Sequence, residues 1–258
     1  MTPEVACRLY HGPESTRTIY MLRIVVVFCA LILSGCGGRV ISLPESGPQK
    51  LVRVDWYGYE SFRVRTSLGL SILTNPFSAG TTESSPPKGL EADVVLITDE
   101  DSKRNYVDGI ENTPRVFRGS VGVGANSAAG VRLLGVPVYR NPDDPAATEK
   151  MSVMFRWASD GLKFGFLGNI PSLPTAQDLS RLGSVDILFL PLSGDHLTTA
   201  NRLEIIKVLK PTVIIPMGSS SAISRFAAGF TSVHRLNGSA ALLSRESLPA
   251  QQTVLVFR

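Results

Sequence analysis

Apolar and polar residues alternate at the start of the segment that is expected to fold. At 52–54 and 62–64, valine or phenylalanine alternates with polar neighbours, which is typical of strands with one buried face. Gly69 separates the second segment from an apolar stretch at 70–73. The pattern predicts three short antiparallel strands.

Further apolar segments predict more strands, and the one at 185–192 is almost uninterrupted, as in a strand buried on both faces. The expected strands cover 94–97, 131–139, 151–157, 162–167, 185–192 and 213–217. The Ser-Asp-Gly turn at 159–161 joins two of them. A helix is expected from a cap at Thr199 to Lys210, where Pro211 stops it. Strands therefore dominate, and the pattern alone allows an α/β or an α+β domain.

The N-terminal segment has the layout of a signal peptide. Arg23 precedes an apolar run at 24–33 that is too short to span a bilayer, and Leu33-Ser34-Gly35-Cys36 follows. These four residues resemble the bacterial lipobox, whose cysteine is acylated after cleavage. An ordinary secretory signal or an uncleaved anchor is the alternative.

Three parts of the chain follow from this interpretation. Residues 1–35 are upstream residues plus the lipoprotein signal peptide, and translation can start at Met1 or Met21. Residues 36–50 are the lipidated Cys36 and a Gly/Pro/Ser tether, and residues 51–258 are one domain. The expected location is the bacterial cell envelope, with the lipid anchored in the membrane.

Charge and cysteine content restrict the possible partners. Of the 26 basic and 22 acidic residues, three and two lie in residues 1–35, so the processed chain carries a net charge of +3. It has no polybasic block, so nucleic acid is not an expected partner. Cys36 is its only cysteine, which excludes an intramolecular disulfide.

The expected strand at 94–97 ends in Thr98-Asp99-Glu100-Asp101-Ser102-Lys103-Arg104-Asn105. This segment resembles the Thr-His-x-His-x-Asp-His signature of the metallo-β-lactamase superfamily, in particular its lactonase-like metal-dependent hydrolases. Asp99 and Asp101 stand at the first two histidine positions, Lys103 at the aspartate and Arg104 at the last histidine. The frame of the motif is present, but its ligands are replaced.

Other landmarks of the same family follow in order between about 52 and 218. Tyr59 follows an aromatic-Gly pair where a histidine is common, and Asn75 stands for the acid of Asp-Pro-Phe. Asn169 stands for the bridging carboxylate of Gly-Asp, Gly218 stands for the final histidine, and no histidine lies at 139–141. The resemblance implies an α+β fold, the four-layer αββα sandwich, with the metal-ligand positions replaced.

The number of histidines and cysteines that could bind zinc argues against a zinc site without reference to any family. Catalytic zinc normally has three protein ligands and an open position, and the processed chain has only two histidines, His196 and His234. Zinc is therefore not expected, and both histidines are expected to be non-catalytic. Mg²⁺ or Ca²⁺ held by Asp99 and Asp101 is a minor alternative.

The loop also carries two cations, which changes what its carboxylates can bind. Lys103 and Arg104 lie beside the two aspartates, and a guanidinium can bind two carboxylate oxygens at once. We expect a loop that neutralises its own charges, with a solvated charge cluster and a cation site as the alternatives.

Two glycine-containing motifs give weaker signals. Gly218-Ser219-Ser220-Ser221-Ala222 partly resembles the nucleophile elbow Gly-x-Ser-x-Gly, but no carboxylate lies between Ser220 and His234. A polar loop is the expected interpretation. The glycines at 119, 122 and 124 lack the Lys-Ser/Thr of a phosphate loop and are expected in turns.

Two functions remain from different classes. The favoured hypothesis is a non-catalytic lipoprotein of this fold with a binding or envelope-assembly role. The alternative is a metal-dependent hydrolase of esters, lactones or phosphoesters that uses an oxygen-rich site at Asp99 and Asp101.

Overall fold

The structure is a computed structural model that describes residues 50–80, 85–141, 151–193 and 197–258. These residues belong to one compact unit, Pro48–Arg258. The expected signal peptide and Cys36 lie outside the described residues. In the part that is described, no helix is long and apolar enough to cross a membrane.

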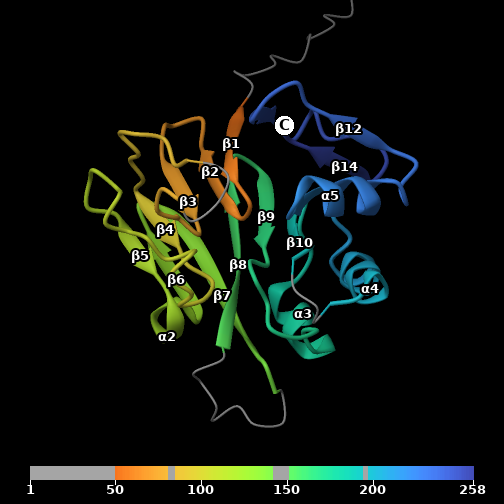
Figure 1. The fold of residues 1–258 in the computed structure, drawn as a ribbon, viewed down its shortest axis with the longest axis horizontal. Helices are drawn as coiled ribbons and strands as arrows, with labels where there is room; N and C mark the ends of the chain where they lie inside the picture. The colour runs from red at the N-terminus through yellow and green to blue at the C-terminus, as the bar shows by residue number, and fades with distance from the viewer. Residues whose placement is uncertain (1–49, 81–84, 142–150, 194–196) are drawn as a thin grey trace, which may run out of the picture. The chain divides into compact units, whose positions relative to one another are not determined.

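Two β-sheets pack face to face (Figure 1). The six-stranded sheet has the order β13 (Ala240–Leu243), β1 (Val52–Gly58), β2 (Ser61–Arg65), β3 (Ser71–Thr74), β4 (Val94–Leu96), β5 (Arg115–Phe117). The eight-stranded sheet has the order β12 (Val233–Arg235), β14 (Thr253–Val256), β11 (Val213–Met217), β10 (Ile187–Pro191), β9 (Leu162–Phe166), β8 (Met151–Ser159), β7 (Val131–Tyr139), β6 (Gly124–Ala128).

The core between the sheets is rich in aromatic rings. Phe62 of β2 lies 4.8 Å from Phe189 of β10, ring centroid to ring centroid, and Trp157 stacks on Phe164 at 5.3 Å. All four side chains are essentially inaccessible to solvent. Burial of such side chains on both inner faces is what holds the two sheets together.

Helices cover the outer face of the eight-stranded sheet. They are α3 (Ala176–Leu182), α4 (Thr199–Leu209) and α5 (Ser220–Ala227), which share a second apolar cluster with β10 and β11. The short α2 (Gly119–Gly122) precedes β6. Over the six-stranded sheet, the described residues that form the outer cluster with Leu73, Val95 and Ile97 come from loops, through Leu90 and Ile110. The predicted α+β sandwich is confirmed, with loops forming much of this outer layer.

The helix predicted from Thr199 begins one residue earlier than expected. Thr198 is the N-cap: its hydroxyl accepts from the Asn201 N–H, and the Asn201 side chain accepts from the Thr198 N–H. A capping box needs an acceptor three residues after the cap. Thr199 has Arg202 at that place, whose side chain can only donate.

Candidate functional site

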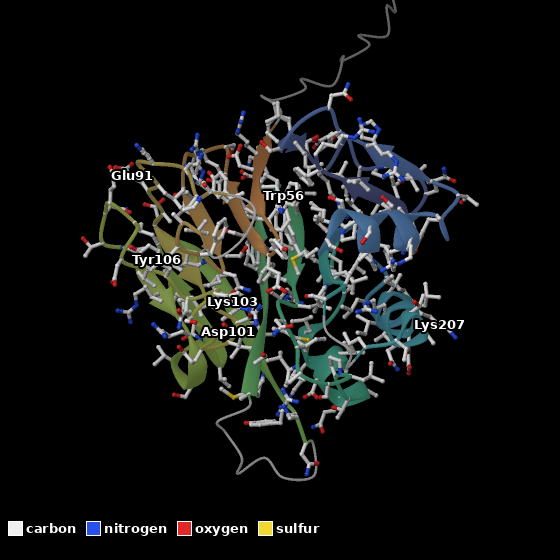
Figure 2. The ribbon with its side chains drawn as sticks, viewed as in Figure 1. Trp56, Glu91, Asp101, Lys103, Tyr106 and Lys207 are labelled. Atoms are coloured by element: carbon white, nitrogen blue, oxygen red, sulfur yellow. The ribbon has the colours of Figure 1, made fainter. Side chains whose placement is uncertain are left out.

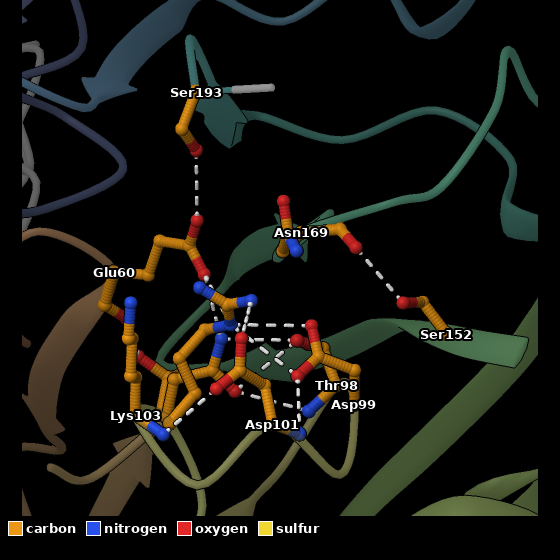
Figure 3. Close-up of polar contacts among 11 residues, drawn as sticks. Glu60, Thr98, Asp99, Asp101, Lys103, Ser152, Asn169 and Ser193 are labelled. Atoms are coloured by element: carbon orange, nitrogen blue, oxygen red, sulfur yellow. Dashed lines mark hydrogen bonds and ion pairs between the residues drawn. The ribbon is translucent and has the colours of Figure 1, made fainter. Parts of the chain in front are cut away.

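The candidate site lies where several strands end at one edge of the sandwich. β3 and β4 run parallel, so their carboxyl ends meet, and they are followed by Asn75 and Thr98. Ser193 follows β10 of the other sheet, and Glu60 lies in the turn between β1 and β2. Figure 3 shows these segments converging around one guanidinium group.

Asn75 ties the ends of the first two strands together. Its Oδ1 accepts from the Thr98 N–H at 3.0 Å, and its Nδ2 donates to Thr98 Oγ1 at 3.0 Å and to Glu60 Oε2 at 3.1 Å. The side chain is buried, and the backbone has a φ of 40°, a left-handed conformation that asparagine tolerates better than most residues. An aspartate here would face Glu60 as a second carboxylate, whereas the amide donates to it.

Glu60 is the most buried charged group of the site, with 5% of its side chain exposed. Its Oε1 accepts from Ser193 Oγ at 3.1 Å, which joins the two sheets (Figure 3). Its Oε2 lies 3.7 Å from Arg104 Nε. Burial raises the pKa of this carboxyl, while Arg104 opposes the rise more than any other neighbour.

Arg104 binds the carboxylates of the 99–105 loop. Its Nε donates to Asp99 Oδ2 at 3.2 Å, and its Nη2 donates to Asp101 Oδ2 at 2.8 Å. Burial alone would lower the pKa of the guanidinium, but Glu60, Asp99 and Asp101 together raise it. The loop therefore holds a permanent cation among three carboxylates.

Hydrogen bonds between residues two positions apart fix the shape of the loop. Asp99 Oδ1 accepts from the Asp101 N–H, and Asp101 Oδ1 accepts from the Lys103 N–H, each at 3.0 Å. These are the side-chain-to-backbone turns that aspartate favours. Among the described residues Lys103 forms no ion pair, and its exposed side chain lines a cavity. Charge neutralisation therefore rests on Arg104, not on both cations as the sequence suggested.

The cavity has a volume of about 230 Å³. It is lined by Tyr59, Glu60, Ser61, Asn75, Phe77, Lys103, Arg104 and Ser193. Tyr59, at a position where the family commonly has a histidine, is 41% exposed. Of the predicted positions, Tyr59, Asn75, Lys103 and Arg104 line this cavity, together with Glu60 and Ser193, which the sequence did not single out.

Two further replaced positions lie at neighbouring strand ends. The Asn169 carbonyl accepts from Ser152 Oγ at 2.8 Å (Figure 3). The preceding Gly168 has a φ of 58°, and a Cβ there would lie 2.2 Å from Thr98 Cγ2. Gly218 is buried, and a Cβ there would lie 3.2 Å from Leu192 Cβ, so Leu192 would have to shift for any larger side chain.

The other sequence motifs lie away from this network. Ser219 is the N-cap of α5, and its hydroxyl accepts from the Ala222 N–H. His234 is exposed on β12. His196 lies outside the described residues. Of the glycines considered for a phosphate loop, Gly119 and Gly122 bound α2 and Gly124 begins β6.

The described residues do not fit the zinc centre that the superfamily implies. Within the ranges that the structure describes, no three His, Cys, Asp or Glu side chains are grouped so that they could hold a metal ion. Zinc would also have to share the carboxylates with the guanidinium of Arg104. The residue types at the ligand positions and the contacts among them in the structure both depart from a zinc site.

Comparison with known proteins identifies a family that matches this chain. A family described as "Beta-lactamase superfamily domain" matches residues 53–218. No curated protein matches the chain.

Three solved structures share the architecture at low identity. A putative zinc-dependent hydrolase of the metallo-β-lactamase superfamily from Thermotoga maritima is 23% identical, with a TM-score of 0.64, over 80% of this chain and 98% of that one. A putative metal-dependent hydrolase from Parabacteroides distasonis is 18% identical, with a TM-score of 0.55, over 70% and 89%. Igni18, a metallo hydrolase from Ignicoccus hospitalis, is 18% identical, with a TM-score of 0.54, over 75% and 99%. The match to the family over most of the folded unit, on a sandwich of the same fold, shows that the chain belongs to the metallo-β-lactamase superfamily.

Proposed function

We propose that the protein is a lipid-anchored, non-catalytic member of this superfamily, attached to the bacterial envelope through Cys36. In this proposal the domain serves binding or envelope assembly, and Arg104 takes the electrostatic role that a metal ion has in the hydrolases. The anchor rests on the lipobox-like Leu33-Ser34-Gly35-Cys36.

The contacts of Arg104 carry the proposal. Its guanidinium donates to Asp99 and Asp101 and lies beside Glu60, so the carboxylates that could attract a cation already have one. A divalent ion about 4 Å from a guanidinium would be repelled by roughly 8 kcal/mol at an effective dielectric constant of 20. Binding would require Arg104 to leave, and its departure would remove its charge-assisted hydrogen bonds.

Metal content and hydrolysis test the proposal directly. The wild-type protein, extracted in detergent, is expected to contain less than stoichiometric metal and to leave ester, lactone and phosphoester substrates intact. Arg118→Ala is a control for the loss of a charged side chain outside the site, since Arg118 pairs with the exposed Glu100 at the surface. Its metal content should equal that of the wild type. Stoichiometric metal that is lost in Asp99→Ala, together with metal-dependent hydrolysis, would instead establish the oxygen-rich enzyme.

Zinc titration gives a second measurement on the same preparation. Zinc at micromolar concentration is expected to leave the melting temperature unchanged, whereas a ligand at a hundredfold excess over its Kd stabilises by about 2.7 kcal/mol. A saturable rise in melting temperature that a chelator reverses would contradict the proposal.

A further inference from the structure

A second cavity is lined by residues of α4 and α5. Figure 1 shows these two helices on the outer side of the eight-stranded sheet. The volume of this cavity is about 300 Å³, at the lower end for small-molecule sites. Its walls include Arg202 and Leu203 of α4, Arg225 and Phe226 of α5, and Phe230 just beyond. None of the described residues that line it is acidic.

Arg202 is a buried cation that has no counterion among the described residues. Only 7% of the residue is exposed, and it forms no ion pair among the described residues. Burial lowers the pKa of its guanidinium, and no carboxylate in the described part of the chain offsets that effect. Burying an unpaired charge is costly, so such groups normally have a partner.

Part of the guanidinium has a structural role. Nε donates to the Pro191 carbonyl at 2.8 Å, and Nη1 donates to the Leu197 carbonyl at 2.6 Å. These bonds hold the two ends of the segment that leads from β10 to α4. Nη2 has no hydrogen-bond partner within the ranges that the structure describes. A neutral donor could satisfy two carbonyls, so the structural role does not account for the charge.

The rest of the cavity suits an organic molecule. The rings of Phe226 and Phe230 lie 4.9 Å apart, centroid to centroid, at 47°. Leu203 adds an apolar surface, and the exposed Arg225 supplies a second positive charge. Apolar walls with few charged groups are typical of sites for small ligands.

We propose that this cavity binds a small organic anion, whose carboxylate or phosphate pairs with Arg202 and Arg225 while its apolar or aromatic part packs on Phe226 and Phe230. The proposal is independent of Arg104 and of the lost metal centre. An inorganic anion would use the charges alone, so the aromatic part predicts a preference that can be measured.

Benzoate, benzamide, phenyl phosphate and inorganic phosphate are suitable probes for the detergent-solubilised protein. Benzoate and benzamide have similar shapes but differ in charge, and we expect benzoate to bind at least tenfold more tightly. Phenyl phosphate should bind more tightly than inorganic phosphate. Comparing the affinities of phenyl phosphate and benzoate shows which acid group is preferred. In ¹⁵N-labelled protein, amide signals of α4 and α5 should shift saturably, with those of residues 99–105 unchanged.

Variants separate this site from general charge effects. Arg202→Met should weaken benzoate binding at least about tenfold, the range for hydrogen bonds to charged groups. Arg225→Met removes an exposed side chain and should weaken it about two- to fivefold, which keeps the test valid if Arg202→Met fails to fold. Lys207→Met is the control, because Lys207 is an exposed cation on the same helix that does not line this cavity. Figure 2 shows Lys207 well apart from Asp101 and Lys103.

Four results of the binding measurements would overturn the proposal, and a fifth comes from a variant of Asp195. The four are the absence of saturable benzoate binding, equal binding of benzamide, unchanged affinity in both arginine variants, and shifts confined to 99–105. Asp195, outside the described residues, is close to Arg202 in sequence, so Asp195→Asn is included. A benzoate affinity that rises fivefold or more in this variant would identify Asp195 as the native counterion and would also reject a ligand site.

Discussion

Replacing Arg104 by alanine tests whether the guanidinium holds the site together. Asp101 is 40% exposed, so its pair with Arg104 is screened and contributes roughly 0 to 1 kcal/mol. Asp99 and Glu60 are only 14% and 5% exposed, and a hydrogen bond to a charged group contributes about 1.5 to 3 kcal/mol. We expect Arg104→Ala to lower the free energy of unfolding by about 2 kcal/mol at pH 7.

The loss should depend on pH because of Glu60. Burial already raises the pKa of this carboxyl above its usual 4.5, and Arg104 opposes that rise. Without Arg104 the pKa in the folded state should rise further, so the folded protein binds a proton that the unfolded chain releases. Stability then falls as pH rises from the unfolded pKa through the folded pKa. The cost of Arg104→Ala should therefore be smallest near pH 5 and grow towards pH 8.

Urea unfolding of wild type and variant at pH 5, 6, 7 and 8 measures this difference. Arg118→Ala is the control, because its partner Glu100 is 53% exposed and the pair is screened. The control should cost less than about 1 kcal/mol. An Arg104→Ala cost below about 0.5 kcal/mol at every pH would refute the reasoning and show a solvated charged loop.

The remaining predictions concern coupling, packing and the anchor. Asp99→Asn and Arg104→Gln together should cost less than the sum of their separate effects in a double-mutant cycle, and strict additivity would exclude a coupled pair. Gly168→Ala should destabilise by about 2 to 4 kcal/mol, because its methyl group would overlap a neighbouring side chain at a left-handed position. Gly130→Ala, with positive φ but open space, should cost about 1 to 2 kcal/mol, and equal costs would rule out the clash. Cys36→Ala should release the protein from membrane fractions or leave an unprocessed precursor, and palmitate labelling that persists would contradict lipidation at this residue.

The sequence predicted β10 and β11 from their strong apolar patterns but missed other strands, among them the weakly patterned β6 and the fully buried β14. β10 and β11 are buried at every position, so a run of apolar residues identifies them. β6 reads Gly-Ala-Asn-Ser-Ala and alternates between half-buried and exposed positions. It forms because β7 supplies hydrogen-bond partners along its length, which no local pattern reports.

The candidate site was predictable where its residues are adjacent in the chain. Asp99, Asp101 and Arg104 share one loop, and opposite charges at that spacing favour mutual pairing. Glu60 and Ser193 are 133 positions apart, and each is an ordinary polar residue in its own segment. Only the packing of the two sheets brings them together. The cue that could have marked Glu60 is a lone carboxylate in the short turn between two strands, directly before β2.

The polar network also links the two sheets of the sandwich. Glu60 belongs to the six-stranded sheet and Ser193 to a loop after the eight-stranded one, so their hydrogen bond crosses the sandwich. The Val153 N–H of β8 likewise donates to the Thr98 carbonyl at 2.8 Å. Burial raises the pKa of Glu60 in this crossing, and Arg104, 3.7 Å away, opposes that rise and so favours the charged carboxylate. The arginine therefore stabilises the edge of the fold where a hydrolase of this superfamily would hold its metal, and a stable edge preserves the sandwich without requiring catalysis.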